Sequence, residues 1–104
     1  MSGPDLSINR GVVDEIVRLA ALEIPGVARV ARGGPAWRAF LAGPAVVTHT
    51  SDQGVRVRLW IVARPGQGLT DLVAQVRAAV GAAVERLLGL RLESVTVTVD
   101  GVGG

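Results

Sequence analysis

Two stretches of this chain repeat their apolar residues with the period of an α-helix, and between them lie runs that alternate with the period of a β-strand. The helical stretches run from Ile8 to Ile24 and from Leu69 to Leu87. A helix with one apolar stripe and a strand with one apolar face must each be buried against another element. The order αβββαβ therefore predicts an α+β fold. We expect a two-layer sandwich with two helices packed on one face of a mainly antiparallel sheet of about four strands.

Turn residues mark the ends of both predicted helices. Asn9 is a favourable N-cap for the first helix, and Pro25 with Gly26 would end it. Gly89 stands where the second helix would end in a left-handed conformation, which glycine adopts without strain. We therefore expect the first helix to begin after Asn9 and the second to end before Gly89.

Four runs rich in β-branched residues predict the strands. The first lies within residues 26–32, and the last alternates from Leu92 onwards. The runs 45–51 and 55–63 are separated by Asp52, Gln53 and Gly54, which are residues typical of a tight turn. We expect these two runs to form a β-hairpin.

The composition excludes several classes of site. The chain has no cysteine, so thiol catalysis, iron–sulfur ligation and thiolate zinc sites are excluded. Its 104 residues predict a single domain over residues 1–104, with a core of about 6–102. No apolar run reaches the roughly 20 residues that span a bilayer, and the N-terminus does not resemble a signal peptide. We therefore expect a cytoplasmic location.

Residues that could support catalysis are few and poorly placed. His49 is the only imidazole, and its nearest acid, Asp52, lies across a turn and not at the spacing of a helical metal pair. A triad of these two with Ser51 would lack a nucleophile elbow. The glycines at 66 and 68 come without a Walker lysine or a complete dinucleotide motif. We predict that the protein is not an enzyme, with no catalytic residue, metal, cofactor or small-molecule substrate.

One face of the predicted sheet combines arginine with tryptophan. Alternation along the third strand sends five side chains away from the helices: Arg56, Arg58, Trp60, Val62 and Arg64. His49 joins this face if the register of the second strand allows. The face is either a solvated sheet surface or a docking surface, since Trp and Arg are enriched at interfaces. The candidate interaction surface consists of Arg56, Arg58, Trp60, Thr96 and Thr98.

A second candidate surface lies between the first two strands. Glycine and proline bracket a segment that holds Trp37, Arg38 and Phe40, at a spacing that would make one helical turn amphipathic. The segment is either a lid on the core or a contact with a partner or a membrane surface.

The basic sheet face also raises nucleic acid as an alternative partner. Sheet-based RNA-binding modules stack bases on exposed aromatic side chains. This chain has one strand tryptophan, and its only GXXG stretch is Gly101 to Gly104 at the C-terminus. RNA binding is therefore kept as the alternative to protein binding.

The order of motifs along the chain resembles that of the alkaline shock protein family, the envelope stress response proteins of Gram-positive bacteria. The resemblance covers residues 6–102 and rests on the stretches 6–9, 12–20, 23–27, 54–62, 66–69, 88–90 and 95–102. Its most specific marks are Pro25-Gly26-Val27 and Leu88-Gly89-Leu90. The Trp37 segment and arginine in place of lysine depart from the pattern.

This resemblance implies a non-catalytic cytoplasmic protein of envelope stress response and cell envelope homeostasis. Such a protein would act as a binding or scaffold module, through self-association or a protein partner. Members of the family gather in some cases at the inner face of the cell membrane through a separate membrane anchor protein. Regulation of a metabolic enzyme through protein contact is a further alternative that the residues do not separate from scaffolding.

Overall fold

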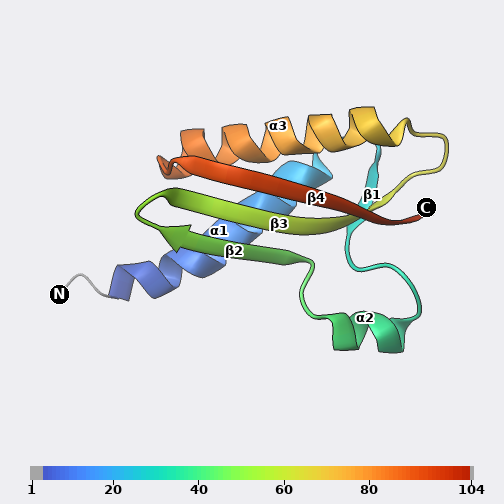
Figure 1. Cartoon of the computed structure of the whole chain (residues 1–104), viewed down its shortest axis with the longest axis horizontal. Coiled ribbons are helices and arrows are strands. Elements are labelled where there is room, and N and C mark those ends of the chain that lie inside the picture. The colour runs from blue at the N-terminus through green and yellow to red at the C-terminus, as the bar shows by residue number, and fades with distance from the viewer. Residues whose placement is uncertain (1–3, 104) are drawn as a thin grey trace.

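The computed structural model describes residues 4–103, and its sheet is built around one strand, β3 (Gly54–Ala63). β2 (Val46–Ser51) pairs antiparallel with the first half of β3, and β1 (Val27–Val30) pairs antiparallel with its end. β4 (Leu92–Val102) runs parallel to β3 along nearly its whole length. β1 and β2 therefore share one edge of β3, and β4 occupies the other edge (Figure 1).

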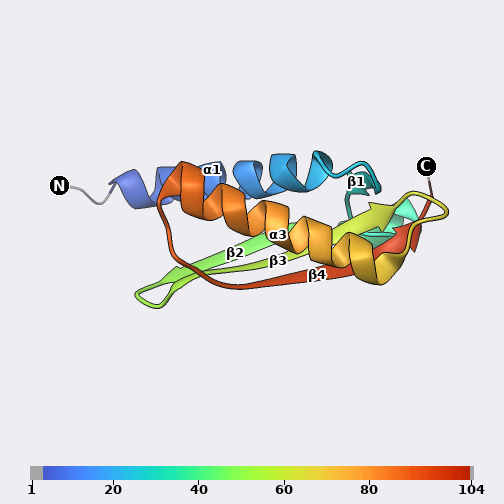
Figure 2. The same ribbon diagram turned by 90° about the horizontal axis from the view of Figure 1, so that it is seen from above.

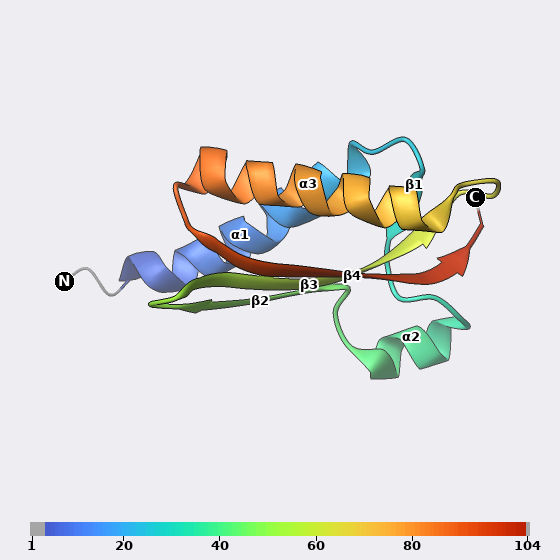
Figure 3. The same ribbon diagram turned by 45° about the horizontal axis from the view of Figure 1, so that its top comes forward.

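Two helices cover one face of this sheet. α1 (Pro4–Leu22) precedes β1, and α3 (Leu69–Leu88) connects β3 to β4, since parallel neighbours need a long crossover. Figures 2 and 3 show α1 and α3 side by side on the same face. The predicted α+β fold with a mainly antiparallel sheet is confirmed, because only the pair of β3 with β4 is parallel.

The core lies between the helices and the sheet and consists mostly of valine. β3 supplies its centre with side chains at alternate positions, and these are fully buried. Both helices meet them with residues spaced three or four apart, so that one stripe of each helix faces inward. The main contributors are Val55, Val57, Leu59 and Ile61 from β3, Val13 and Val17 from α1, and Val76, Val80 and Val84 from α3.

The expected hairpin and the expected end of α3 are both found. Ser51 pairs with Gly54 across the turn, where Gly54 has a φ of 123°. Gly89 adopts φ 65° and ψ 21°, in the left-handed region, and its N–H donates to the carbonyl of Val84. Glycine is required at both positions, because other residues adopt positive φ only with strain.

The expected start of the first helix at Asn9 is wrong. α1 begins at Pro4, so Asn9 lies inside the helix and does not cap it. Proline suits the first helical position, because its missing N–H would have no partner there and its φ is already helical. Asparagine costs a helix interior only a fraction of a kcal/mol, roughly 0.7 or less, which packing can outweigh.

The expectation that Val62 and Arg64 extend an uncovered outer face of β3 is also wrong. Val62 keeps the alternation of β3, because its neighbours Ile61 and Ala63 belong to the core cluster and Val62 does not, yet it is only 2 % exposed. The register shifts at this end place the extra residues in β1 and β4, and Gly101 of β4 lies beside the Val62 side chain and helps to cover it. Arg64 lies beyond the end of β3, and its Nε donates to the carbonyl of Pro25 at 3.0 Å.

The segment between β1 and β2 forms a short helix, α2 (Ala36–Ala42), that does not cover the core. Figure 3 shows it on the side of the sheet opposite α1 and α3. Trp37 is 67 % exposed, and no described side chain of α2 belongs to the core cluster. The lid interpretation of this segment is therefore wrong.

Replacing Leu59 by alanine tests the core. The change removes a fully buried side chain at the centre of β3 and should lower the free energy of unfolding by about 2–5 kcal/mol. Arg58→Thr alters the exposed neighbour and should change it by no more than about 0.5 kcal/mol. Urea denaturation of both variants measures the difference, and equal stabilities would contradict the assigned faces of β3.

Candidate functional site

The sheet face opposite α1 and α3 carries the five residues of the first candidate surface. Arg56, Arg58 and Trp60 alternate with the core residues of β3 and point the other way. Thr96 of β4 stands beside Arg58, and Thr98 beside Trp60. The register of the parallel pair therefore brings all five onto one surface, although their role stays a prediction.

β2 widens this surface on the other side of β3. His49 pairs with Arg56 and Val47 with Arg58, so both side chains lie among the arginines. A shallow depression forms there, and Ser94 of β4 lines it as well. We call the whole surface the open sheet face, and it consists of Val47, His49, Arg56, Arg58, Trp60, Ser94, Thr96 and Thr98.

The two arginines of β3 differ in their electrostatic surroundings. Arg56 Nε lies 3.8 Å from Oε1 of Glu93, in an exposed ion pair of the kind that contributes at most about 1 kcal/mol. Arg58 forms no ion pair with any described residue, and its guanidinium carbon lies 5.2 Å from the centre of the Trp60 ring. Arg58 is therefore the positive charge on this face most available to a partner.

Trp60 is held by a second arginine that sequence reasoning missed. The guanidinium carbon of Arg32 lies 3.4 Å from the centre of the Trp60 ring, close enough for a cation–π interaction. Arg32 Nε also donates to the carbonyl of Pro44 at 3.3 Å. Nothing in the sequence indicates this contact, because Arg32 and Trp60 meet only through the pairing of β1 with β3.

The loop that carries Arg32 is tied to the end of β4. The N–H of Gly33 donates to Oδ2 of Asp100 at 2.8 Å. A Cβ at position 33 would collide with the backbone carbonyl oxygen of Asp100, so only glycine allows this approach. The contact fixes the position of Arg32 over Trp60.

The second candidate surface adjoins the first at Trp60. Arg38 of α2 and Trp60 line the same small cavity, together with Arg32 and Asp100. Trp37 points to solvent, and the side chain of Phe40 lies outside the described part of the structure. The two candidate surfaces therefore meet at one end of the open sheet face.

The residues considered for catalysis are not assembled into a site. Ser51 Oγ accepts the N–H of Gln53 at 3.1 Å within the hairpin turn. Among the side chains that the structure describes, no three from histidine, aspartate or glutamate lie close enough to hold a metal ion. In the described part of the chain no helix is long and apolar enough to cross a membrane.

Replacing Gly33 by alanine tests the loop over Trp60. The added Cβ must displace the backbone at Asp100, and we expect the free energy of unfolding to fall by about 1–3 kcal/mol. In a Trp37→Phe background, the fluorescence of Trp60 should also shift to longer wavelength as Arg32 leaves its ring. Gly11→Ala is the matched control, because a Cβ there meets nothing within 4 Å and should stabilise α1. Unchanged stability and emission in Gly33→Ala would contradict the close approach to Asp100.

Several solved structures share this fold. A zinc form of a MamM CTD variant is 20% identical, with a TM-score of 0.58, and the match covers 89% of this chain and 86% of that chain. A manganese form of another MamM CTD variant is 22% identical, with a TM-score of 0.57 and coverage of 88% and 98%. At these identities the likeness shows the fold alone. No curated protein matches the chain.

A family model settles the relationship that the motif order indicated. The model of the alkaline shock protein 23 family, described by its cell envelope-related function, matches residues 3–103. The match spans the motifs from α1 to β4, so the resemblance noted from the sequence is confirmed. This protein therefore belongs to the alkaline shock protein 23 family, whose function is related to the cell envelope.

Proposed function

We propose that this protein is a non-catalytic binding module of the cell envelope that docks a protein partner on its open sheet face. The observation that carries the proposal is Arg58 beside Trp60, exposed on a face that neither long helix covers. Trp and Arg are the side chains that most often dominate the energy of protein interfaces. Val47 adds an exposed apolar side chain beside Arg58.

The charge of the face favours an acidic partner. Among the described residues, Arg58 has no acidic neighbour, and Arg56 has only the loose contact with Glu93. A second copy presenting the same face would bring like charges together, which is unfavourable. A carboxylate of a partner would instead pair with Arg58 while the partner covers Trp60 and Val47.

The family and this surface together support a scaffold role. In this proposal the module is cytoplasmic and reaches the inner face of the cell membrane through its partner, for example a membrane anchor protein. The partner can equally be a metabolic enzyme that the module regulates. RNA is the alternative ligand, because phosphates are attracted by the same arginines.

Charge reversal at Arg58 tests the proposal. The tagged protein is used to capture partners from a nuclease-treated extract, and the retained proteins are quantified by mass spectrometry. Arg58→Glu should reduce the amount of the partner at least about tenfold, which corresponds to 1.4 kcal/mol. Arg18→Glu on α1 makes the same change of charge away from the face and should leave capture unchanged.

The double variant Arg56→Glu with Arg58→Glu checks that the fold survives, and its circular dichroism should match that of the unmodified chain because both side chains are exposed. Full retention of the partner by this folded variant would contradict the proposal. Binding that nuclease abolishes and that falls steeply with salt would replace the protein partner by RNA.

A further inference from the structure

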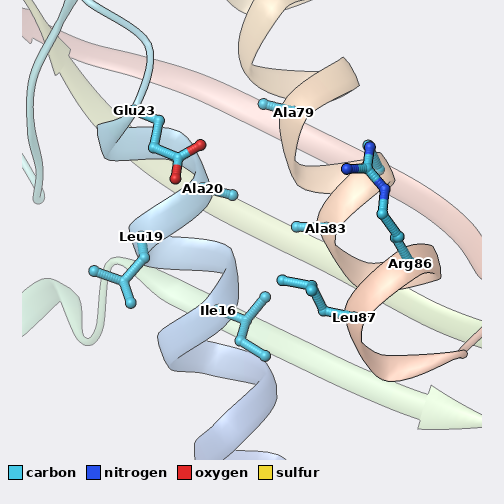
Figure 4. Close-up of a pocket in the computed structure, with 9 residues that line it drawn as sticks. Ile16, Leu19, Ala20, Glu23, Ala79, Ala83, Arg86 and Leu87 are labelled. Atoms are coloured by element: carbon cyan, nitrogen blue, oxygen red, sulfur yellow. The ribbon is translucent and has the colours of Figure 1, made fainter.

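A groove runs between α1 and α3 on the surface of the helix layer (Figure 4), with a volume of about 430 Å³. Its floor is made of alanines, among them Ala20 from α1 and Ala79 and Ala83 from α3. Because alanine ends at Cβ, the two helices leave a hollow where larger side chains would have filled the space.

Two leucines stand on the walls of this groove and are exposed. Leu19 of α1 is 48 % exposed and Leu87 of α3 is 68 % exposed. Removing an exposed leucine side chain from water is favourable, so both leucines would be stabilised by a partner that covers them. Exposed leucines beside a hollow lined by alanines resemble the ridges and grooves through which helices pack against one another.

The walls also carry opposite charges. Glu23 lies on the α1 wall and Arg86 on the α3 wall, and Figure 4 shows them on opposite sides of the groove. Neither side chain forms an ion pair with another described residue. The groove thus offers one unpaired acid and one unpaired base, unlike the open sheet face, whose charge is mainly positive.

These features make the groove complementary to itself. A two-fold axis that lies in the plane of this surface, perpendicular to the line from Glu23 to Arg86 (Figure 4), places the α1 wall of one copy over the α3 wall of the other. Glu23 then faces the partner's Arg86 twice, once on each side of the axis. In the same arrangement the exposed Leu87 of each copy approaches the alanine floor of the other.

We propose that this groove is the interface of a two-fold symmetric dimer, and that its occupant is a second copy of this chain. A stable interface needs roughly 800 Å² from each copy. The helices of 19 and 20 residues are each about 30 Å long and lie side by side, which gives a face of that order. The dimer does not use the open sheet face, so it stands independently of the proposed function.

Light scattering on the purified full chain tests the dimer directly. The unmodified protein should have twice the 10.7 kDa mass of one chain. Glu23→Arg alone and Arg86→Glu alone should each weaken the dimer at least tenfold, since each places like charges across the axis. A third variant, Leu87→Ser, should weaken it by removing the apolar contact.

Mixing the two charge variants separates the interface from any effect on folding. A one-to-one mixture of Glu23→Arg with Arg86→Glu should restore the dimer, because both cross-axis pairs are opposite in charge again. No contact within one chain is repaired by mixing. Glu23 and Arg86 both lie near helix C-termini, where a positive charge is favourable and a negative charge is unfavourable. Glu23→Arg should therefore stabilise its helix and Arg86→Glu should destabilise its helix. Loss of the dimer in both variants thus cannot be explained by a common loss of helix stability.

The control variant is Arg58→Glu, which should remain a dimer whether or not it loses its partner. A wild-type monomer at hundreds of micromolar would overturn the proposal. A dimer that persists in all three groove variants would also overturn it. A dimer that Arg58→Glu dissociates would overturn it as well, because the contact would then lie on the open sheet face. Failure of the mixture to restore what both single variants lose would overturn the two-fold arrangement.

Discussion

The structure depends on the alternation of side chains along β3. This strand pairs with β1, β2 and β4, and none of those three is held in the sheet by another. A shift of one residue in the pairing register of β3 would turn the side chain of Arg58 toward the core and that of Leu59 toward water. Burial of an unpaired charge costs several kcal/mol, so the register of β3 fixes the core and the open sheet face together.

The two outer surfaces of the sandwich have different chemistry because they come from different elements. The sheet surface is basic and carries tryptophan, whereas the helix surface carries an alanine groove with one charge of each sign. A surface of one sign suits a partner of the opposite sign, and a surface of both signs suits its own copy. The two contacts that we propose, with a partner and with a second copy, therefore use opposite layers and do not compete.

What the sequence predicts here follows from local rules, and what it misses follows from long-range contacts. The period-two pattern of β3 is enough to place Arg56, Arg58 and Trp60 on one face, and Gly89 is enough to end α3. The burial of Val62 on the outer face depends on the end of β4 that lies against it, a contact which no single segment encodes. The contact of Arg32 with Trp60 likewise needs β1 to be paired first.

The start of α1 and the position of α2 show a different limit of prediction from the sequence. Asn9 is compatible with a cap and with a helix interior, so its residue type alone does not decide. For α2, aromatic spacing indicates an amphipathic turn but not whether its apolar side meets the core, and Trp37 faces solvent.

The crossover through α3 affects how the chain folds as it is made. The β2–β3 hairpin forms from neighbouring residues, whereas β4 reaches its edge of β3 only after α3 has been synthesised. Until then the second edge of a valine-rich strand is unpaired, and such edges are sites of aggregation. The nascent chain is thus most vulnerable to misassembly between the completion of β3 and the docking of β4.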